Sequence, residues 1–355
     1  MPDQRTEGWR RTSLRGLDLS SLDIPSARPS LAVSGLALSL EDALHDSRLE
    51  PLVRCHFAHV VDVEADKFVA LHYALFNVAT VVVVPRGQVI HEPVELRYTA
   101  NGPILAHTLM VLEDEADLAG LIEFFSSGTG FASGVLEMVV GQNAHTRYVQ
   151  MQRLNPEVWN FSTQRATLAQ DASLRTLNVA LGARMSRNTV QVVLNGRGSQ
   201  ADLLGIVDAS GRQHVDFQTL QDHFGDATRS DLVIHNALRD RSSTNFTGLI
   251  RINKSAHQTE SSQEQKNVLL SDSAKADSDP KLEILNNDVI RCTHGAAVGP
   301  VDEEMVFYLQ SRGLDRSTAE QLIVEGFFQS TLARLQQPAL EETIWSVLNE
   351  RWSRA

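Results

Sequence analysis

Cysteine is nearly absent from this chain, since Cys55 and Cys292 are the only two in 355 residues. Two thiols so far apart do not make a disulfide framework, which points to a reducing compartment. The formal net charge of −12 argues against a nucleic-acid-binding surface, because that needs a basic patch. No run approaches the roughly 18 apolar residues of a membrane span, and residues 1–16 lack the apolar core of a secretory signal. We therefore expect a cytoplasmic protein that binds neither nucleic acid nor membrane.

Familiar catalytic motifs are missing as well. Residues 195–198 (NGRG) form a glycine-containing turn without the lysine and hydroxyl residue of a phosphate-binding loop. No Gly-x-Ser-x-Gly elbow occurs, so serine hydrolase chemistry has no support. The sequence therefore favours a non-enzymatic protein, and any ATP hydrolysis would come from a partner.

What the chain does contain is a long succession of short strand-like runs. From about residue 81 to 285, segments rich in Val, Thr and Leu alternate apolar with polar residues and are separated by Gly, Asn, Asp and Ser. Such a stretch forms a sandwich, a propeller or a solenoid. We favour a parallel β-helix, because few gaps look like the Asn-Gly or Asp-Gly turns of hairpins. The polar segment 254–280 carries one further expected strand at NVLLS, residues 267–271.

Helical patterns flank this β region. Residues 1–79 are expected to be partly helical or flexible, with helices near 38–49 and 71–79. The β-helix should occupy 80–298, and residues 299–355 should form a small helical domain. There, a helix over 302–312 ends at Gly313, residues 317–320 (STAE) read as a capping box, and Pro338 separates a second helix from one over 340–352. About fifty residues are too few for stability without docking to another surface.

The segment RCTHGAAVG, residues 291–299, marks the change from strand to helix. In a strand, Cys292 and His294 point to the same face, where a thiolate and an imidazole can share a metal. The plainer interpretation is a small apolar cysteine beside a hydrogen-bonded histidine. Cys55 and His59 would form a second pair if their segment were helical, but that pair would lack further ligands. The remaining histidines show no ligand spacing and are expected to be structural.

Several motifs in order resemble the SufB/SufD family of iron–sulfur cluster assembly proteins, and within it the SufD subunit of the SufBCD complex. They are AHQT (256–259), NVLLS (267–271), PKLEI (280–284), CTHGAAVG (292–299) and the helix from Asp302 to Gly313. Upstream, VPRG (84–87) resembles the family's entry into its β-helix. The resemblance covers residues 74 to about 330. The sequence departs from the family pattern at Arg86, Thr293 and Ala297.

The resemblance implies a right-handed parallel β-helix with a C-terminal helical domain, acting as a non-catalytic scaffold. It implies pairing with a SufB-like subunit near the C-terminal end of the β-helix, and binding of a SufC-like ATPase by the helices. Cys292 and His294 would lie at the subunit interface and contribute to a transient iron–sulfur cluster or iron site, which this chain alone would not hold stably. Reduced flavin can bind such a complex, and the chain can form a homodimer when alone. The apolar residues proposed for helix packing or ATPase docking are Phe307, Tyr308, Leu322, Ile323, Phe327 and Phe328.

Two alternatives stay open. The first is a SufB-like homodimeric scaffold; against it, Thr293 and Gly295 occupy positions where SufB-type sequences carry glutamates, and no cysteine lies between Cys55 and Cys292. The second is a carbohydrate-active β-helix enzyme, which would usually be secreted and would carry clustered charged residues on one sheet. The sequence favours the SufD-like scaffold over both.

Overall fold

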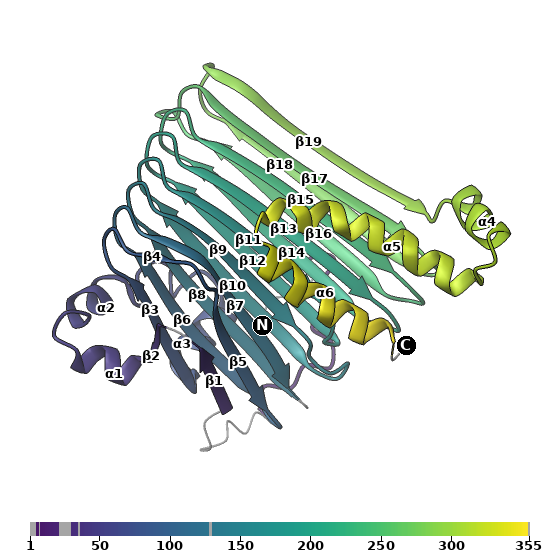
Figure 1. Ribbon diagram of the computed structural model, residues 1–355, viewed down its shortest axis with the longest axis horizontal. Helices are drawn as coiled ribbons and strands as arrows, with labels where there is room; N and C mark the ends of the chain where they lie inside the picture. Colours follow the sequence, from purple (N-terminus) through teal and green to yellow (C-terminus); the bar gives the residue numbers. More distant parts are fainter. Residues whose placement is uncertain (1–4, 7, 21–29, 35, 128–129, 354–355) are drawn as a thin grey trace.

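Two facing β-sheets make up the body of the protein in the computed structural model, which describes residues 5–6, 8–20, 30–34, 36–127 and 130–353 (Figure 1). Sheet A contains β1 (Ser30–Ser34), β5 (Val94–Ala100), β7 (Asp117–Ser127), β9 (His145–Gln152), β11 (Ser173–Ala180), β13 (Gln200–Ala209), β15 (Arg229–Leu238), β17 (Thr259–Leu269) and β19 (Val289–Pro300), in that order, with β4 (Val89–Ile90) beside β7. Sheet B contains, in order, β2 (Ala37–Ser39), β3 (Val78–Val84), β6 (Ile104–Leu112), β8 (Phe131–Val140), β10 (Trp159–Leu168), β12 (Met185–Leu194), β14 (His214–His223), β16 (Ser243–Ile252) and β18 (Lys275–Ile284).

The chain winds between the two sheets as a parallel β-helix. Each full circuit, or rung, adds one strand to sheet A and one to sheet B, and from β6 onward neighbouring strands within a sheet are parallel. Trp159 is paired with Met185, which is 26 residues later, whereas Ser243 is paired with Lys275, 32 residues later. Because the length of a rung varies, the sequence has no fixed period although the structure repeats.

Apolar side chains fill the lumen between the sheets. Leu96, Tyr98, Leu203 and Leu232 are buried there at 0–2% exposure, in a cluster that runs along most of the β-helix. Residues of sheet A that point the other way, such as Leu204, are also buried because helices cover that face. Strands buried on both faces are rich in Val, Ile and Leu, which explains the apolar runs in the sequence.

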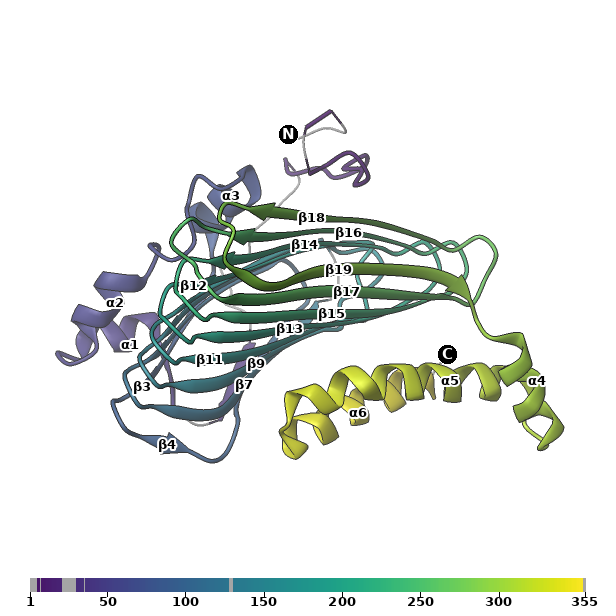
Figure 2. The same cartoon turned by 90° about the horizontal axis from the view of Figure 1, so that it is seen from above.

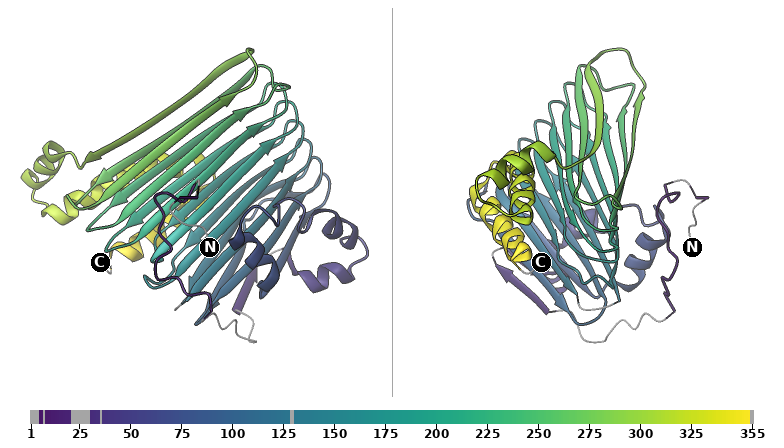
Figure 3. Two further views of the ribbon diagram at one scale, coloured as in Figure 1. Left: turned by 180° about the vertical axis from the view of Figure 1, so that it is seen from behind. Right: turned by 90° about the vertical axis from the view of Figure 1, so that its right-hand side faces the viewer.

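At the N-terminal end of the β-helix each sheet ends in a short antiparallel strand. Strand β1 pairs antiparallel with β5, and β2 pairs antiparallel with β3. Helices α1 (Leu40–His45), α2 (Glu50–His56) and α3 (Lys67–Leu75) follow β2, and Ala43 and Val53 pack on the outer face of sheet B with Val81 and Leu109. Residues 8–20 lie along the outer side of the same sheet, opposite the C-terminal helices (Figure 3). There Thr12 donates a hydrogen bond to Asp216 (2.6 Å).

The C-terminal helices cover the outer face of sheet A. Helix α4 (Glu303–Ser311) leads into α5 (Arg316–Leu332), a single 3-10 turn (Ala333–Leu335) and α6 (Pro338–Trp352). Figure 2 shows α5 and α6 on the side of sheet A away from sheet B, with α4 beyond the end of β19. Phe328, Leu332 and Ile344 are completely buried against this face. The helical segment is therefore docked on the β-helix instead of standing alone.

The structure confirms the predicted fold class, which is a mainly β protein with a parallel β-helix, C-terminal helices and a partly helical N-terminal region. Several local predictions need correction. Helix α3 ends at Leu75, so residues 78 and 79 belong to β3 and not to the helix expected over 71–79. Ser317 does not begin α5, because the N-cap is Asp315, whose carboxylate accepts a hydrogen bond from the Thr318 amide (2.9 Å). Within the described residues, no helix is long and apolar enough to cross a membrane.

Candidate functional site

The C-terminal end of the β-helix is open. Within the part of the chain that the structure describes, β19 pairs only with β17 and β18 only with β16, so each sheet ends there in an edge strand of ten or more residues. Large apolar side chains on or next to these strands are exposed, namely Leu282, Ile284, Leu285, Ile290 and Val298. A long edge with apolar side chains is a template on which another strand can pair. This edge is the first part of the candidate site.

Cys292 and His294 both lie on β19 and face the mouth of the lumen. Cys292 is in register with Ser261 and His294 with Gln263, and Gln263 is in turn in register with the lumen residue Leu232. Two residues along a strand span roughly 6.6 Å, so the two side chains stand next to each other on one face. The shared face expected from their spacing is thus present at the open end.

The environments of the two side chains differ. Cys292 is half-buried against Ile250, Ile252 and Ala256, and this burial raises the pKa of its thiol. Because a metal binds the thiolate form of cysteine, metal binding to Cys292 must displace the proton of its thiol. His294 is exposed and makes no hydrogen bond or ion pair with any described residue. Both donors are therefore unengaged by polar partners in the isolated chain.

These two donors do not make a complete metal site. Among the residues that the structure describes, no three His, Cys, Asp or Glu side chains are placed to hold one ion. The chain offers one soft and one borderline ligand, and further ligands would have to come from another molecule.

A column of polar side chains lies in the lumen next to Cys292, and the sequence analysis did not identify it. Ser261 is hydrogen bonded to Ser230 (2.7 Å), and Ser230 to Nε2 of His223 (2.8 Å), whose Nδ1 is hydrogen bonded to Thr228 (2.8 Å). Burial lowers the pKa of His223 to about 4, so its ring is neutral at pH 7. The lumen thus changes from apolar to polar towards its open end. The only signal in the sequence was the recurrence of Ser, Thr and His one rung apart.

Helix α4 supplies the second part of the candidate site. Phe307 is 73% exposed and Tyr308 is 55% exposed. Met305, also on α4, and Leu322, on α5, are exposed as well. The helix is held on α5 by Arg316, which pairs with both Glu303 (2.6 Å) and Glu320 (2.7 Å). We call Met305, Phe307, Tyr308 and Leu322 the α4 patch.

The other apolar residues predicted here have different surroundings. Ile323 is half-buried between α4 and α5, and Phe327 stacks on His235 of sheet A with ring centres 4.1 Å apart. Phe328 is completely buried, so it belongs to the core that docks α5 and not to a surface.

Cys55 and His59 do not lie on one helix, which is the arrangement that a metal pair would require. Helix α2 ends at His56, and His59 lies beyond it, with Nδ1 2.8 Å from the carbonyl oxygen of Phe57. Cys55 and His59 are therefore not four residues apart on one helix, and no metal pair is proposed there.

The fold and this open edge define the class of the protein, a parallel β-helix with helices docked beside its C-terminal end. Residues 97–327 match the model of the SufBD core domain of the SUF system for iron–sulfur cluster assembly. The chain belongs to the SufBD family.

Individual relatives carry both subunit names. A SufBD family protein of Mycobacterium bovis is 31% identical over 296 residues, which cover 81% of this chain and 74% of that protein. SufD of Escherichia coli is 26% identical over 378 residues, covering 99% and 89%. SufB of Bacillus subtilis is also 26% identical, over 286 residues that cover 79% of this chain and 61% of that protein. The identities alone do not separate a SufD role from a SufB role.

Proposed function

We propose that this chain is a SufD-type scaffold subunit that pairs with a SufB-like subunit through β18 and β19 and binds a SufC-like ATPase through the α4 patch. Cys292 and His294 contribute to a cluster site that the partner completes, and the iron–sulfur cluster is cargo of the complex. The observation that carries this proposal is the open edge of both sheets, with apolar side chains exposed along it.

The position of the two candidate ligands supports a shared site. Cys292 and His294 lie on the last strand of sheet A, so a strand added to this edge would run directly beside them. An incomplete ligand set at an unpaired edge is what an interfacial site requires, because each subunit supplies part of it. Thr293 and Gly295, which replace the glutamates of SufB-type sequences, favour the SufD role over a SufB-like homodimer.

The edge is tested by co-expression with the SufB-like and SufC-like proteins of the same organism. Val298→Lys places a charge on the exposed edge and should abolish co-purification of the SufB-like subunit while the ATPase is retained. Val89→Lys is the matched control, because Val89 is 50% exposed and Val298 47% exposed, but Val89 lies on β4 at the other end of the β-helix. Equal recovery of the SufB-like subunit with both variants would contradict pairing through this edge. A variant that instead dissociates a homodimer of the chain alone would support the SufB-like alternative.

The α4 patch is tested in the same co-expression. Phe307→Ala should remove the ATPase and keep the SufB-like subunit, because exposed aromatic residues are frequent hot spots that cost about 2 kcal/mol or more when truncated. Phe224→Ala is the control, since Phe224 is 42% exposed on a turn of the β-helix. Retention of the ATPase by both variants would contradict docking through α4.

The ligand assignment is tested on the reconstituted complex. His294→Ala should lower the yield of cluster, followed by visible absorbance and by iron and sulfide content, without changing the subunit composition. His257→Ala, at another exposed histidine, should have no effect. An unchanged yield with His294→Ala would exclude this residue as a ligand.

A further inference from the structure

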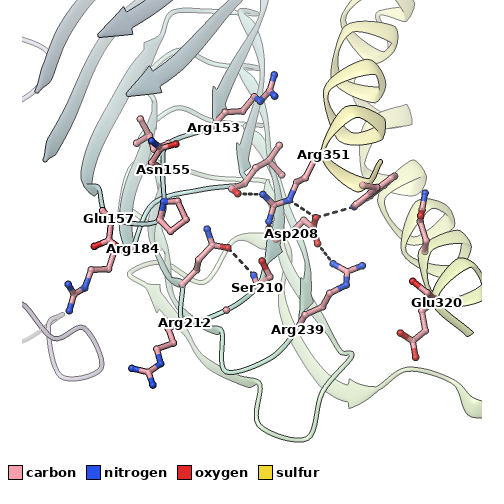
Figure 4. Close-up of a pocket in the computed structure, with 18 residues that line it drawn as sticks. Arg153, Asn155, Glu157, Arg184, Asp208, Ser210, Arg212, Arg239, Glu320 and Arg351 are labelled. Atoms are coloured by element: carbon pink, nitrogen blue, oxygen red, sulfur yellow. Dashed lines mark hydrogen bonds and ion pairs between the residues drawn. The ribbon is translucent and has the colours of Figure 1, made fainter. Parts of the chain in front are cut away.

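The outer faces of the two sheets are held by different parts of the chain. On sheet A, helix α6 is tied to the β-helix through Asp208 of β13, which is paired with Arg351 of α6 and with Arg239 after β15 (Figure 4). On sheet B, residues 8–20 lie across the later rungs and contain neither a helix nor a strand (Figure 3). We call residues 8–20 the strap.

The strap follows one column of outward-facing side chains on five neighbouring strands of sheet B. These residues are in register with one another on β10, β12, β14, β16 and β18, and they are Phe161, Arg187, Asp216, Asn245 and Asp277. Strap residues contact four of the five, and these contacts span the sheet from β10 to the edge strand β18.

Trp9 is the first anchor of the strap. It is 5% exposed, and its ring centre lies 6.3 Å from that of Phe161 and 5.5 Å from that of Phe68 on α3. The guanidinium group of Arg187 lies 4.0 Å from the centre of the Trp9 ring and donates a hydrogen bond to the carbonyl oxygen of Gly8 (2.9 Å). A buried indole with a cation–π contact fixes the start of the strap on β10 and β12.

Thr12 is the second anchor, because its hydroxyl group donates to the carboxylate of Asp216. Asp216 is completely buried and is paired with Arg187. It accepts hydrogen bonds from Thr12 (2.6 Å), Gln218 (2.7 Å) and Asn245 (2.9 Å). One carboxylate thus joins the strap to β12, β14 and β16. A buried carboxylate requires such donors, so the strap and the three strands stabilise one another here.

Arg11 lies between the two anchors and is paired with Asp277 on the edge strand β18. Both side chains are about half exposed, and an isolated pair of this kind contributes little, because ordering two flexible side chains costs entropy. Trp9 and Thr12 already fix the backbone on either side of Arg11, so less of that cost falls on the pair. In a solenoid each rung contacts only its neighbours. The strap gives β18 an additional contact, with a segment that is fixed on β10 to β14.

We propose that the strap positions the edge strand β18 for pairing with a partner strand, with Arg11 as the positioning residue and Trp9 and Thr12 as its anchors. Strand β18 is mostly exposed and contains Pro280, which has no amide hydrogen to donate, so β16 alone holds it less firmly than a strand of the core. Ordering a strand during association weakens binding, so an edge that is already ordered pairs more tightly. The effect on the partner rests on the proposed function, whereas the contact of the strap with β18 does not.

Hydrogen exchange of the full-length chain tests the contact. Arg11→Asp places two carboxylates opposite each other, and amide exchange in residues 275–284 should rise about three- to tenfold without a change in β6 and β8. Trp9→Ala, which removes the first anchor, should raise exchange in the same residues. The double variant Arg11→Asp, Asp277→Arg should restore slow exchange, because it exchanges the two charges. Arg10→Asp is the matched control, since Arg10 is an exposed neighbour without an ion pair to a described residue. Unchanged exchange in Arg11→Asp or Trp9→Ala, or an equal rise in Arg10→Asp, would overturn the proposal.

Co-expression with the SufB-like and SufC-like proteins tests the positioning. Arg11→Asp should lower recovery of the SufB-like subunit by about threefold or more, and the charge-exchanged double variant should restore it, with equal recovery of the ATPase. Full recovery with Arg11→Asp, alongside loss with Val298→Lys, would overturn the positioning role and leave the proposed function intact. Full recovery with Val298→Lys as well would contradict the proposed function, and hydrogen exchange alone would then decide whether the strap holds β18.

Discussion

Glu137 is the residue through which the N-terminal region is attached most firmly to sheet B. Its carboxylate is completely buried on β8 and accepts hydrogen bonds from the backbone amides of Ala58 (2.7 Å), Val60 (2.8 Å) and Val61 (2.9 Å). Nε2 of His107 lies 3.0 Å from the same oxygen that accepts from Ala58. One carboxylate thus accepts hydrogen bonds from three backbone amides of the loop that connects α2 to α3.

Replacing Glu137 by Gln keeps the volume of the side chain but removes its charge and turns one oxygen into an NH₂ group. That NH₂ group must face either Val60 and Val61 or Ala58 and His107, so at least one hydrogen bond from a backbone amide is lost together with the charge. Hydrogen bonds to a charged group are worth about 1.5–3 kcal/mol each, and breaking a buried charged pair costs about 3–5 kcal/mol. We expect the free energy of unfolding at pH 7 to fall by about 3–5 kcal/mol.

The same residue predicts a pH dependence. Burial alone would raise the pKa of Glu137, but the hydrogen bond and charge of His107, with the backbone amides, lower it below its usual value of 4.5. A carboxyl group whose pKa is lower in the folded state stabilises the protein above its unfolded pKa, and this contribution is lost as the pH falls through the folded pKa. The difference in stability between the natural chain and Glu137→Gln should therefore shrink below about pH 4.5.

Urea unfolding at pH 7 and at pH 4 measures both effects. The control Glu115→Gln removes an exposed carboxylate paired with Arg86, and it should change the stability by less than about 1 kcal/mol. Hydrogen exchange in residues 57–62 should rise in Glu137→Gln and not in the control. If Glu137→Gln unfolds within 1 kcal/mol of the natural chain at pH 7, Glu137 does not anchor the region in the way described.

Three further predictions concern the C-terminal half. Phe328→Ala should lower the free energy of unfolding by about 3–5 kcal/mol, measured in urea, because it empties a fully buried site between α5 and sheet A; a loss below 1 kcal/mol would mean that α5 is not docked there. Iodoacetamide at pH 8 should alkylate the exposed Cys55 faster than Cys292, followed by peptide mass spectrometry, because burial raises the pKa of the Cys292 thiol and reduces its access; equal rates would contradict its half-buried position. Asp208→Asn should raise hydrogen exchange in α6, since Asp208 accepts from Arg351 and Trp352 of that helix; unchanged exchange in α6 would show that the contact is dispensable.

Much of the β-helix could be predicted because its strands alternate or are continuously apolar. The turns were harder to recognise, since each rung requires a residue in the left-handed region at nearly the same place. Asn143, Asp171, Ala227 and Gln258 take this conformation with φ between 53° and 54°. Glycine stands at two of the corresponding described positions, Gly87 and Gly198, with φ of 67° and 72°. The hydrogen bonds between stacked turns stabilise these conformations, and that information is not local in the sequence.

The last rungs were difficult for a different reason. Strands β17 and β18 are polar, and β18 contains Pro280, so only part of this stretch was predicted as a strand. Exposure removes the need for apolar side chains on the edge strand β18, where proline is tolerated. The polar lumen residues of β17 are buried instead, and hydrogen bonds such as that of Ser261 with Ser230 satisfy them. Similarly, helical spacing could not distinguish Phe307 from Phe328. Only the packing of α5 on sheet A shows that one is exposed and the other buried.

The two ends of the β-helix differ in a way that limits how large an assembly can become. Within the described residues both sheets finish in edge strands at each end, but β1 and β2 have five and three residues, whereas β18 and β19 have ten and twelve. A subunit with one long edge can join one other long edge, and the joined pair then offers only the short edges at β1 and β2 to a third copy. Short edge strands are a poor template for further pairing, so growth stops at two β-helices and does not proceed to a filament. Lengthening β1 and β2 would turn a pair-forming subunit into a polymerising one.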